Sequence, residues 1–228
     1  MAITARYIAD GALIKLNQAT GGTSSRYTDA EALRFINDGQ LAIVGLARRA
    51  YTKRVVATPS AGSSRQTFAD LGITDGVSVI DVPSNYSSDG SARTTAITKR
   101  DRSHLDDVLP SWRTYTGTPK HWCYDPDDPK AFDLTPAPTT TRVEVIYGAI
   151  PPSVGAIGNP IALDDIYAPA LEAYLLYSWC SKASDQGLQA LAVGYMQLFQ
   201  SLLGIRDQKP AAQGAAANAR ASGQAGAI

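Results

Sequence analysis

Segments with the helical spacing of apolar residues lie at both ends of this 228-residue chain, and residues 55–154 between them have the composition and alternation of β-strands. Amphipathic helices bury their apolar stripes against one another or against a sheet. We therefore predict an α+β fold. Residues 1–54 and 155–208 form a helical bundle, residues 55–154 form an inserted antiparallel β-rich region, and residues 209–228 form an extended C-terminal tail.

The N-terminal segment predicts two helices. Residues 3–18 carry apolar side chains at close to the helical period. A capping box at residues 28–31, in which Thr28 and Glu31 satisfy free backbone donors, predicts that the second helix begins there. Cations crowd the far end of this second helix, where the helix dipole favours positive charge: Arg48, Arg49, Lys53 and Arg54.

The middle of the chain predicts strands. Short alternating runs at residues 78–82, 93–98 and 142–147 are separated by turn signals rich in Gly, Pro and Asp. Antiparallel strands fit such short connections better than a parallel sheet with crossover helices. One short helical segment is predicted at residues 103–112.

Two further helices follow the prolines at positions 151 and 152. One begins near residues 163–165, where carboxylates suit a helix N-terminus. After a corner at residues 184–187, the other carries a stripe at helical spacing: Leu188, Leu191, Tyr195, Leu198, Phe199 and Leu202. Residues 209–228 are rich in Ala, Gly, Gln, Ser and Asn and hold too little apolar bulk to fold alone. We predict that this tail gains order by docking on another chain.

Composition excludes several classes of protein. The chain has 21 basic and 21 acidic residues, so no global field attracts nucleic acid or an anionic membrane. No run approaches the roughly 18 apolar residues of a membrane span, and no basic start with a long apolar run marks a signal peptide. Cys123 and Cys180 stand far apart without metal-ligand spacing, which predicts free thiols in the core.

The sequence offers little for catalysis. His104 and His121 belong to no metal or nucleophile motif, and no glycine-rich loop has the form of a phosphate or dinucleotide site. Asp125, Asp127 and Asp128 could bind calcium, but the prolines around them favour a rigid turn. We predict a protein that is not an enzyme and uses no cofactor.

Aromatic residues allow two interpretations. They could stack on bases or sugars, or they could be core or interface residues: Trp112, Tyr115, Trp122 and Tyr124.

The order of several short motifs resembles the head-to-tail adaptor proteins of short-tailed bacteriophages. The matching pieces, after the N-terminal helix, are RYTDAEALRFINDGQ at 26–40, LPSWR at 109–113, GTP at 117–119, LTPAP at 134–138, the strand ending in Tyr147 and the helix start DIY at 165–167. The resemblance implies a structural subunit of a twelvefold ring. Such a ring lies beneath the portal protein, extends the DNA channel and offers its lower rim to the tail tube or nozzle protein.

The resemblance also implies partners and a location. Double-stranded DNA passes through the channel without sequence-specific binding, no membrane is involved, and the protein belongs at the head-tail junction of a virion after synthesis in the cytoplasm of the host bacterium. The C-terminal segment would reach up the outer surface of the portal. Residues assigned to portal binding on this basis are Lys209, Pro210, Arg220, Gln224 and Ile228.

Two further groups of residues are candidates for sites. Subunit contacts in the ring are predicted for Arg48, Arg49, Arg100, Arg102, Trp112 and Trp122. Acidic residues that could face the channel are Asp38, Asp106, Asp107 and Glu144. The alternative function is a ligand- or glycan-binding tail accessory or fibre module of a virion, in which Trp and Tyr side chains of the β-rich region bind the ligand.

Overall fold

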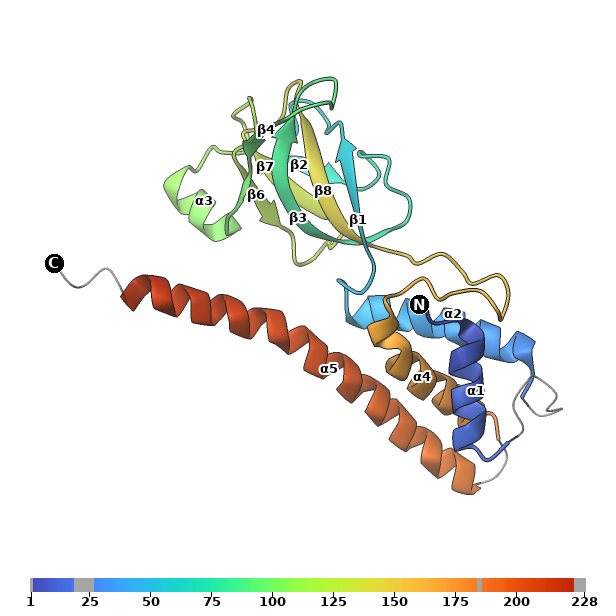
Figure 1. Cartoon of the computed structure of the whole chain (residues 1–228). Helices are drawn as coiled ribbons and strands as arrows, with labels where there is room; N and C mark the ends of the chain where they lie inside the picture. The colour runs from blue at the N-terminus through green and yellow to red at the C-terminus, as the bar shows by residue number, and fades with distance from the viewer. Residues whose placement is uncertain (1, 19–26, 184–185, 224–228) are drawn as a thin grey trace. The chain divides into compact units, whose positions relative to one another are not determined.

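The computed structural model describes residues 2–18, 27–183 and 186–223 and divides into two compact units (Figure 1). Residues 1–47 and 152–228 form a helical unit, and residues 48–151 form a β-rich unit inserted between them. The predicted α+β class is confirmed, because helices at both ends of the chain flank a region of mainly antiparallel strands.

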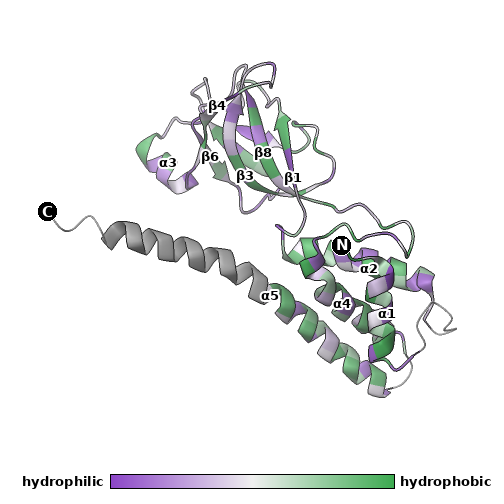
Figure 2. Ribbon diagram, in the orientation of Figure 1, coloured by the Kyte–Doolittle hydropathy of each residue, from purple (hydrophilic) through white to green (hydrophobic). Residues whose placement is uncertain are grey.

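The central helix of the helical unit is α4 (Ala168–Ser181), which follows a short 3-10 turn, η1 (Asp165–Tyr167). It contacts α1 (Ala5–Lys15), α2 (Asp29–Leu46) and α5 (Gln186–Gly223). Hydrophobic residues cover much of α4 and of the adjoining part of α5 (Figure 2). A helix that is apolar on several sides is a buried helix, and α4 accordingly buries Leu171, Leu175, Leu176 and Trp179.

The predicted start of α2 is confirmed, but its predicted end is wrong. The Thr28 side chain accepts a hydrogen bond from the Glu31 amide over 3.3 Å, which caps the helix. The helix ends at Leu46, so Arg48 and Arg49 follow it, and the next two cations, Lys53 and Arg54, lie on a strand. Pairing of that strand with a neighbour, helped by the β-branched Val55 and Val56, overrides the continuation of the helix.

The last helix also differs from the prediction. The sequence predicted that this helix ends by residue 208 and that residues 209–228 are extended. In the structure, α5 continues to Gly223. Alanine has the highest helix propensity of any residue, so a segment poor in apolar bulk can still be helical. Residues 224–228 and the first half of the predicted corner, residues 184–185, lie outside the described residues.

The face of α5 that packs on α4 is narrower than predicted. Ala192, Phe199 and Leu203 are buried, whereas Leu191 and Leu198, from the predicted stripe, are about half exposed. The most extensive packing of α5 within the helical unit is on α4, which covers one strip of the helix.

Two four-stranded sheets form the β-rich unit. The first has the order β1 (Thr52–Ala57), β8 (Arg142–Ala149), β3 (Gly76–Tyr86) and β4 (Arg93–Ala96), and the second has the order β2 (Arg65–Thr67), β7 (Ala131–Thr135), β6 (His121–Tyr124) and β5 (Thr98–Lys99). All paired strands are antiparallel except β5 and β6. The predicted short helix is α3 (Arg102–Val108), which follows β5 directly.

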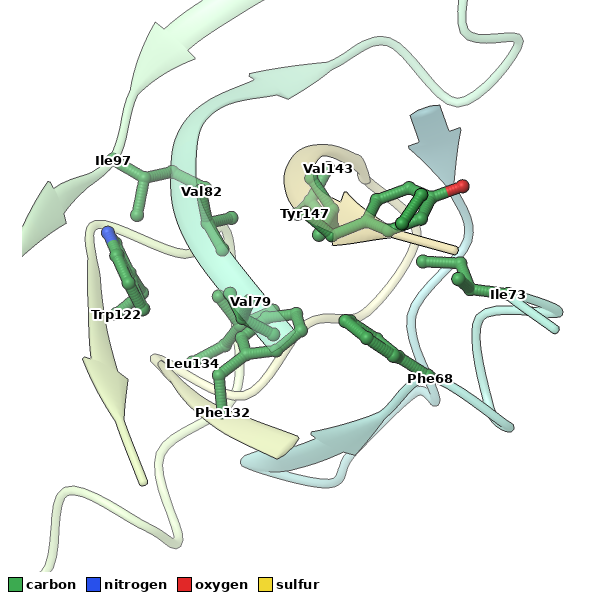
Figure 3. Close-up of a cluster of buried hydrophobic side chains, with 12 residues drawn as sticks. Phe68, Ile73, Val79, Val82, Ile97, Trp122, Phe132, Leu134, Val143 and Tyr147 are labelled. Carbon is green, nitrogen blue, oxygen red and sulfur yellow. The ribbon is translucent and has the colours of Figure 1, made fainter. Parts of the chain in front are cut away.

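The core of the β-rich unit joins residues of both sheets (Figure 3). The rings of Trp122 and Phe132 meet edge to face with centroids 6.4 Å apart, and Phe68 packs on Tyr147 at 5.5 Å. Gly76, at the start of β3, lies against Phe68 so closely that a Cβ atom there would sit 2.2 Å from the ring. The two sheets therefore share one hydrophobic core.

Candidate functional site

Three of the six residues predicted for subunit contacts, Arg48, Arg100 and Arg102, lie at one cleft of the β-rich unit. This cleft, of about 370 Å³, is lined by Lys99, Arg100, Asp101, Arg102 and Tyr124, and we call it the cationic cleft. Arg48, from the start of the unit, donates from Nη1 to the Tyr124 hydroxyl over 2.7 Å. The structure thus brings together residues that are far apart in the sequence.

Pairing of β5 with β6 positions these cations. The parallel register sets Thr98 opposite His121 and Lys99 opposite Trp122, and the Arg100 amide donates to the Trp122 carbonyl over 2.9 Å. The Lys99 ammonium lies 5.3 Å from the centre of the Trp122 ring and 5.6 Å from that of Tyr124. Cations over aromatic faces are attracted to them, so Lys99 is held at the wall of the cleft.

Carboxylates lie on one side of the cationic cleft and neutralise Arg102. Its Nη2 atom donates to Asp133 over 2.5 Å and to Asp125 over 3.3 Å. Asp125 also accepts from Arg65 over 2.7 Å, and this hydrogen bond is the main reason that its pKa is lowered to about 2. Arg65 bonds Asp128 as well, over 2.9 Å.

The Asp-Pro loop is therefore held by arginines. Two of the three carboxylates considered for calcium, those of Asp125 and Asp128, bind guanidinium groups, which supports the turn interpretation. No group of three or more metal-ligating side chains occurs among the described residues.

Other cations of this surface have no acidic partner among the described residues. Within the part of the chain that the structure describes, Arg48, Lys99, Arg100 and Lys120 form no ion pair with a carboxylate. Burial, with smaller contributions from Arg100 and Lys120, lowers the pKa of His121. Positive charge is therefore concentrated around β5 and the start of β6.

The two tryptophans of the predicted interface are core residues, so that prediction is corrected. Trp112 is fully buried against Leu105 and Cys123, and its Nε1 donates to Asp106 over 2.8 Å. Trp122 is 1% exposed. Large aromatic side chains add more stability in a core than at the surface.

The same burial takes the two tryptophans, but not the tyrosines, out of the glycan-binding alternative. Both tryptophans of the β-rich unit are hidden, whereas Tyr115 is 51% exposed. Cys123 and Cys180 are buried thiols that form no disulfide in the described chain, as predicted, and burial raises the pKa of the Cys123 thiol to about 11.

The acidic channel candidates have different surroundings. Glu144 is buried and accepts from the Ser84 hydroxyl over 2.9 Å, Asp106 pairs with Arg113, and Asp38 lies 3.9 Å from Arg34 on the surface of α2. Asp107 is exposed on α3. Asp106 and Asp107 are thus neighbours on α3, Glu144 lies on β8, and Asp38 belongs to the helical unit.

A second surface, on the helical unit, was missed by sequence reasoning. A groove of about 510 Å³ lies between α1 and the start of α4, and we call it the acidic groove because Asp10, Asp165 and Glu172 line it. Tyr7 and Ile14, two helical turns apart on α1, are 67% and 66% exposed beside it. The sequence feature that could have revealed this surface is the pair of large apolar residues that α1 carries on the face opposite its buried residues.

None of the described helices has the length and hydropathy needed to cross a bilayer. A family model described as SU10 adaptor protein matches residues 4–223, which include both units. No curated protein sequence matches the chain. The match supports the adaptor resemblance seen in the order of the motifs, and it covers almost the whole sequence: the chain belongs to the SU10 adaptor protein family.

Proposed function

We propose that this chain is a structural subunit of the head-to-tail adaptor of a short-tailed phage virion. The observation that carries the proposal is the family match over residues 4–223, which includes the inserted β-rich unit and, apart from the terminal residues, the helical unit with the whole of α5. In this role twelve copies form a ring beneath the portal protein, the DNA channel continues through the ring, and the tail tube or nozzle protein binds below. The chain acts through its surfaces and catalyses no reaction.

The length of α5 supports a docking role for its C-terminal half. Its 38 residues span about 57 Å, whereas the 14 residues of α4, on which it packs, span about 21 Å. A helix without tertiary contacts is marginal in water, because packing supplies most helical stability in proteins. The portal is the proposed partner of residues 209–228, with Lys209, Pro210, Arg220, Gln224 and Ile228 at the contact.

Repetition in a ring strengthens such a contact. A short segment that orders on binding has modest affinity, since part of the binding energy is lost to ordering. Many identical segments on one ring bind the portal together, and the effective concentration of each one rises once its neighbours are bound. A weak individual contact is therefore sufficient for stable attachment.

Deletion of residues 209–228 tests the docking role. We expect the truncated protein to keep its thermal midpoint and to lose no more circular dichroism signal than the helical residues 209–223 supply, but to lose binding to purified portal, measured by mass photometry and by electron cryo-microscopy of the mixture. Full-length protein with Arg220→Ala is the milder comparison and should bind more weakly than wild type. Equal portal binding by the truncated and full-length proteins would refute the docking role.

The ring itself has a separate test. Wild-type protein mixed with portal should give a particle with twelve copies of this chain. A chain that stays monomeric in the presence of portal and tail proteins contradicts the adaptor role.

A further inference from the structure

The cationic cleft is lined by polar and charged side chains. Its lining residues are Lys99, Arg100, Asp101, Arg102 and Tyr124. None of the large apolar side chains that are exposed in the described chain belongs to this lining. Protein interfaces have an apolar core, whereas interfaces with DNA are more polar and much more positive. The composition of the cleft therefore suits a nucleic-acid partner better than a protein partner.

Positive charge at this surface is not neutralised within the chain. Residues 48–151 are all described, and the cations among them that form no ion pair are Arg48, Arg49, Lys99, Arg100, Lys120, Lys130 and Arg142. Lys99 and Arg100 line the cleft, Arg48 bonds its Tyr124, and the Lys120 carbonyl accepts from the amide of Thr98 on β5 over 3.0 Å. Four of these unpaired cations are therefore grouped around β5.

The carboxylates of this surface already have partners. Asp101, which lines the cleft, accepts from the Ser103 amide over 3.2 Å and from its hydroxyl over 3.1 Å, and so caps α3. Asp125 and Asp133 bind Arg102. The four unpaired cations therefore remain available to an anion from outside the chain.

Contacts with neutral groups hold two of these cations in position. Lys99 lies over the rings of Trp122 and Tyr124, and Arg48 donates to the Tyr124 hydroxyl over 2.7 Å. A ring face and a hydroxyl orient a cation without cancelling its charge. Side chains that are ordered before binding lose less entropy when a partner binds. Lys99 and Arg48 are therefore prepared for an anionic partner.

We propose that the cationic cleft, together with Arg48 and Lys120, binds the phosphate backbone of duplex DNA without reading its sequence. Lysine, arginine and tyrosine side chains are common contacts of DNA phosphates, and the cleft supplies Lys99, Arg100 and the Tyr124 hydroxyl. The choice of duplex DNA among phosphate polymers rests on the proposed function, in which the ring surrounds DNA.

Such a contact suits DNA that must move. Binding through phosphates is independent of sequence and allows a protein to slide along DNA. A ring repeats the same few contacts on every copy, so a weak single site gives a larger total attraction. The ring can therefore retain DNA without stopping its passage.

Removal of charge from the cleft tests the contact in the full-length chain. The cleft variant is Lys99→Ala with Arg100→Ala. The matched control is Lys130→Ala with Arg142→Ala, which removes two cations without an ion pair from other parts of the same unit. Circular dichroism and thermal unfolding establish that each variant is folded. Fluorescence anisotropy of a labelled random-sequence duplex then measures binding over a series of salt concentrations.

We expect wild-type affinity for the duplex to fall as salt rises, by about 0.9 in the slope of log K against log salt for each phosphate contact. The cleft variant should bind at least about tenfold more weakly at low salt and should lose about 2 from this slope. The control should keep the wild-type slope, and two duplexes of unrelated sequence should bind equally. The wild-type slope needs no variant, so a slope near zero overturns the proposal even where a variant fails to fold.

Equal DNA binding by the cleft variant and the control also overturns the proposal. Labelled polyglutamate is the second probe. If it binds wild type more tightly than the duplex does and loses binding in the cleft variant, the cleft serves an acidic protein and the proposal is wrong. A chain that assembles on the portal but does not bind DNA leaves the proposed function standing, whereas failure to assemble on the portal counts against that function itself.

Discussion

The Nη1 atom of Arg65 lies 2.7 Å from the Oδ2 atom of Asp125, and 60 positions separate the two residues in the sequence. The Asp125 side chain is 6% exposed, so its charge is balanced by arginine more than by water. Arg102 adds a second guanidinium at 3.3 Å. This carboxylate therefore ties the loop after β6 to β2 and to the start of α3.

Asp125→Asn should destabilise the β-rich unit by about 2 kcal/mol, because the guanidinium groups of Arg65 and Arg102 lose the carboxylate that they share. The loss is no larger because Arg65 is partly exposed to water. The free energy of unfolding, from urea titration followed by tryptophan fluorescence, measures the effect. Asp127→Asn, in the same loop but exposed, is the control and should change stability by less than about 0.5 kcal/mol. Equal effects of the two substitutions contradict this account.

The contribution of Asp125 should depend on pH in the acid range. Its pKa is lowered to about 2 in the folded chain, against about 3.9 for an unperturbed aspartate. A lowered pKa stabilises the fold above the unfolded value, and this stabilisation is lost as pH falls toward the folded value. The stability difference between wild type and Asp125→Asn should therefore be constant above about pH 5 and shrink between about pH 4 and pH 2. A difference that persists unchanged at pH 2 argues against ionic bonding.

Gly76→Ala should destabilise the β-rich unit by about 2 kcal/mol. The added methyl group would lie 2.2 Å from Phe68, and this ring cannot move away without disturbing its packing on Tyr147. Thermal unfolding measures the loss. Gly158→Ala provides the control, because a Cβ atom there meets no atom within 4 Å.

Trp122→Ala should cost about 3–5 kcal/mol, because it removes a large side chain from the core between the sheets. Tyr115→Ala, at an exposed aromatic, should leave stability within about 0.5 kcal/mol of wild type. Urea titration of both variants separates the core role from a surface role. Wild-type stability in Trp122→Ala with loss of a bound ligand would revive the glycan-binding alternative.

Thr28→Ala should cost about 1 kcal/mol, since the capping hydrogen bond to the Glu31 amide is lost at the start of α2. Thr28→Ser keeps the hydroxyl and should retain most of the stability. Amide hydrogen exchange at the first turn of α2 is the local measurement. Equal exchange rates in Thr28→Ala and wild type would show that the cap contributes nothing.

Local signals predicted part of this fold well. The capping residue Thr28 acts on an amide three positions away, so short-range chemistry is enough to locate the start of α2. The end of that helix depends on pairing of Val55 with Val145, which is a contact across the whole insertion. A stretch of a few residues shows the local preference for helix, but it does not show the strand about 90 positions later that pairs with residues 52–57.

The candidate site was predicted in part for a similar reason. Charge and residue type singled out Arg48, Arg100 and Arg102, and the structure places them around one cleft. Composition could not show that Trp112 and Trp122 are buried, because an aromatic residue suits a core and an interface equally. Tyr7 and Ile14 lie within the predicted first helix, residues 3–18, but only the packed structure shows that their side chains are exposed.

The chain enters the β-rich unit at β1 and leaves it at β8, and these two strands are hydrogen-bonded neighbours, with Thr52 opposite Gly148. The entry and exit points are therefore separated by about 5 Å, the spacing of adjacent strands. Such a small gap can be closed by a short turn, so the helical unit does not need this particular insertion to keep its own geometry. Recombination can accordingly exchange the whole inserted unit as a cassette, which lets the surface it carries diverge while the helical unit is retained.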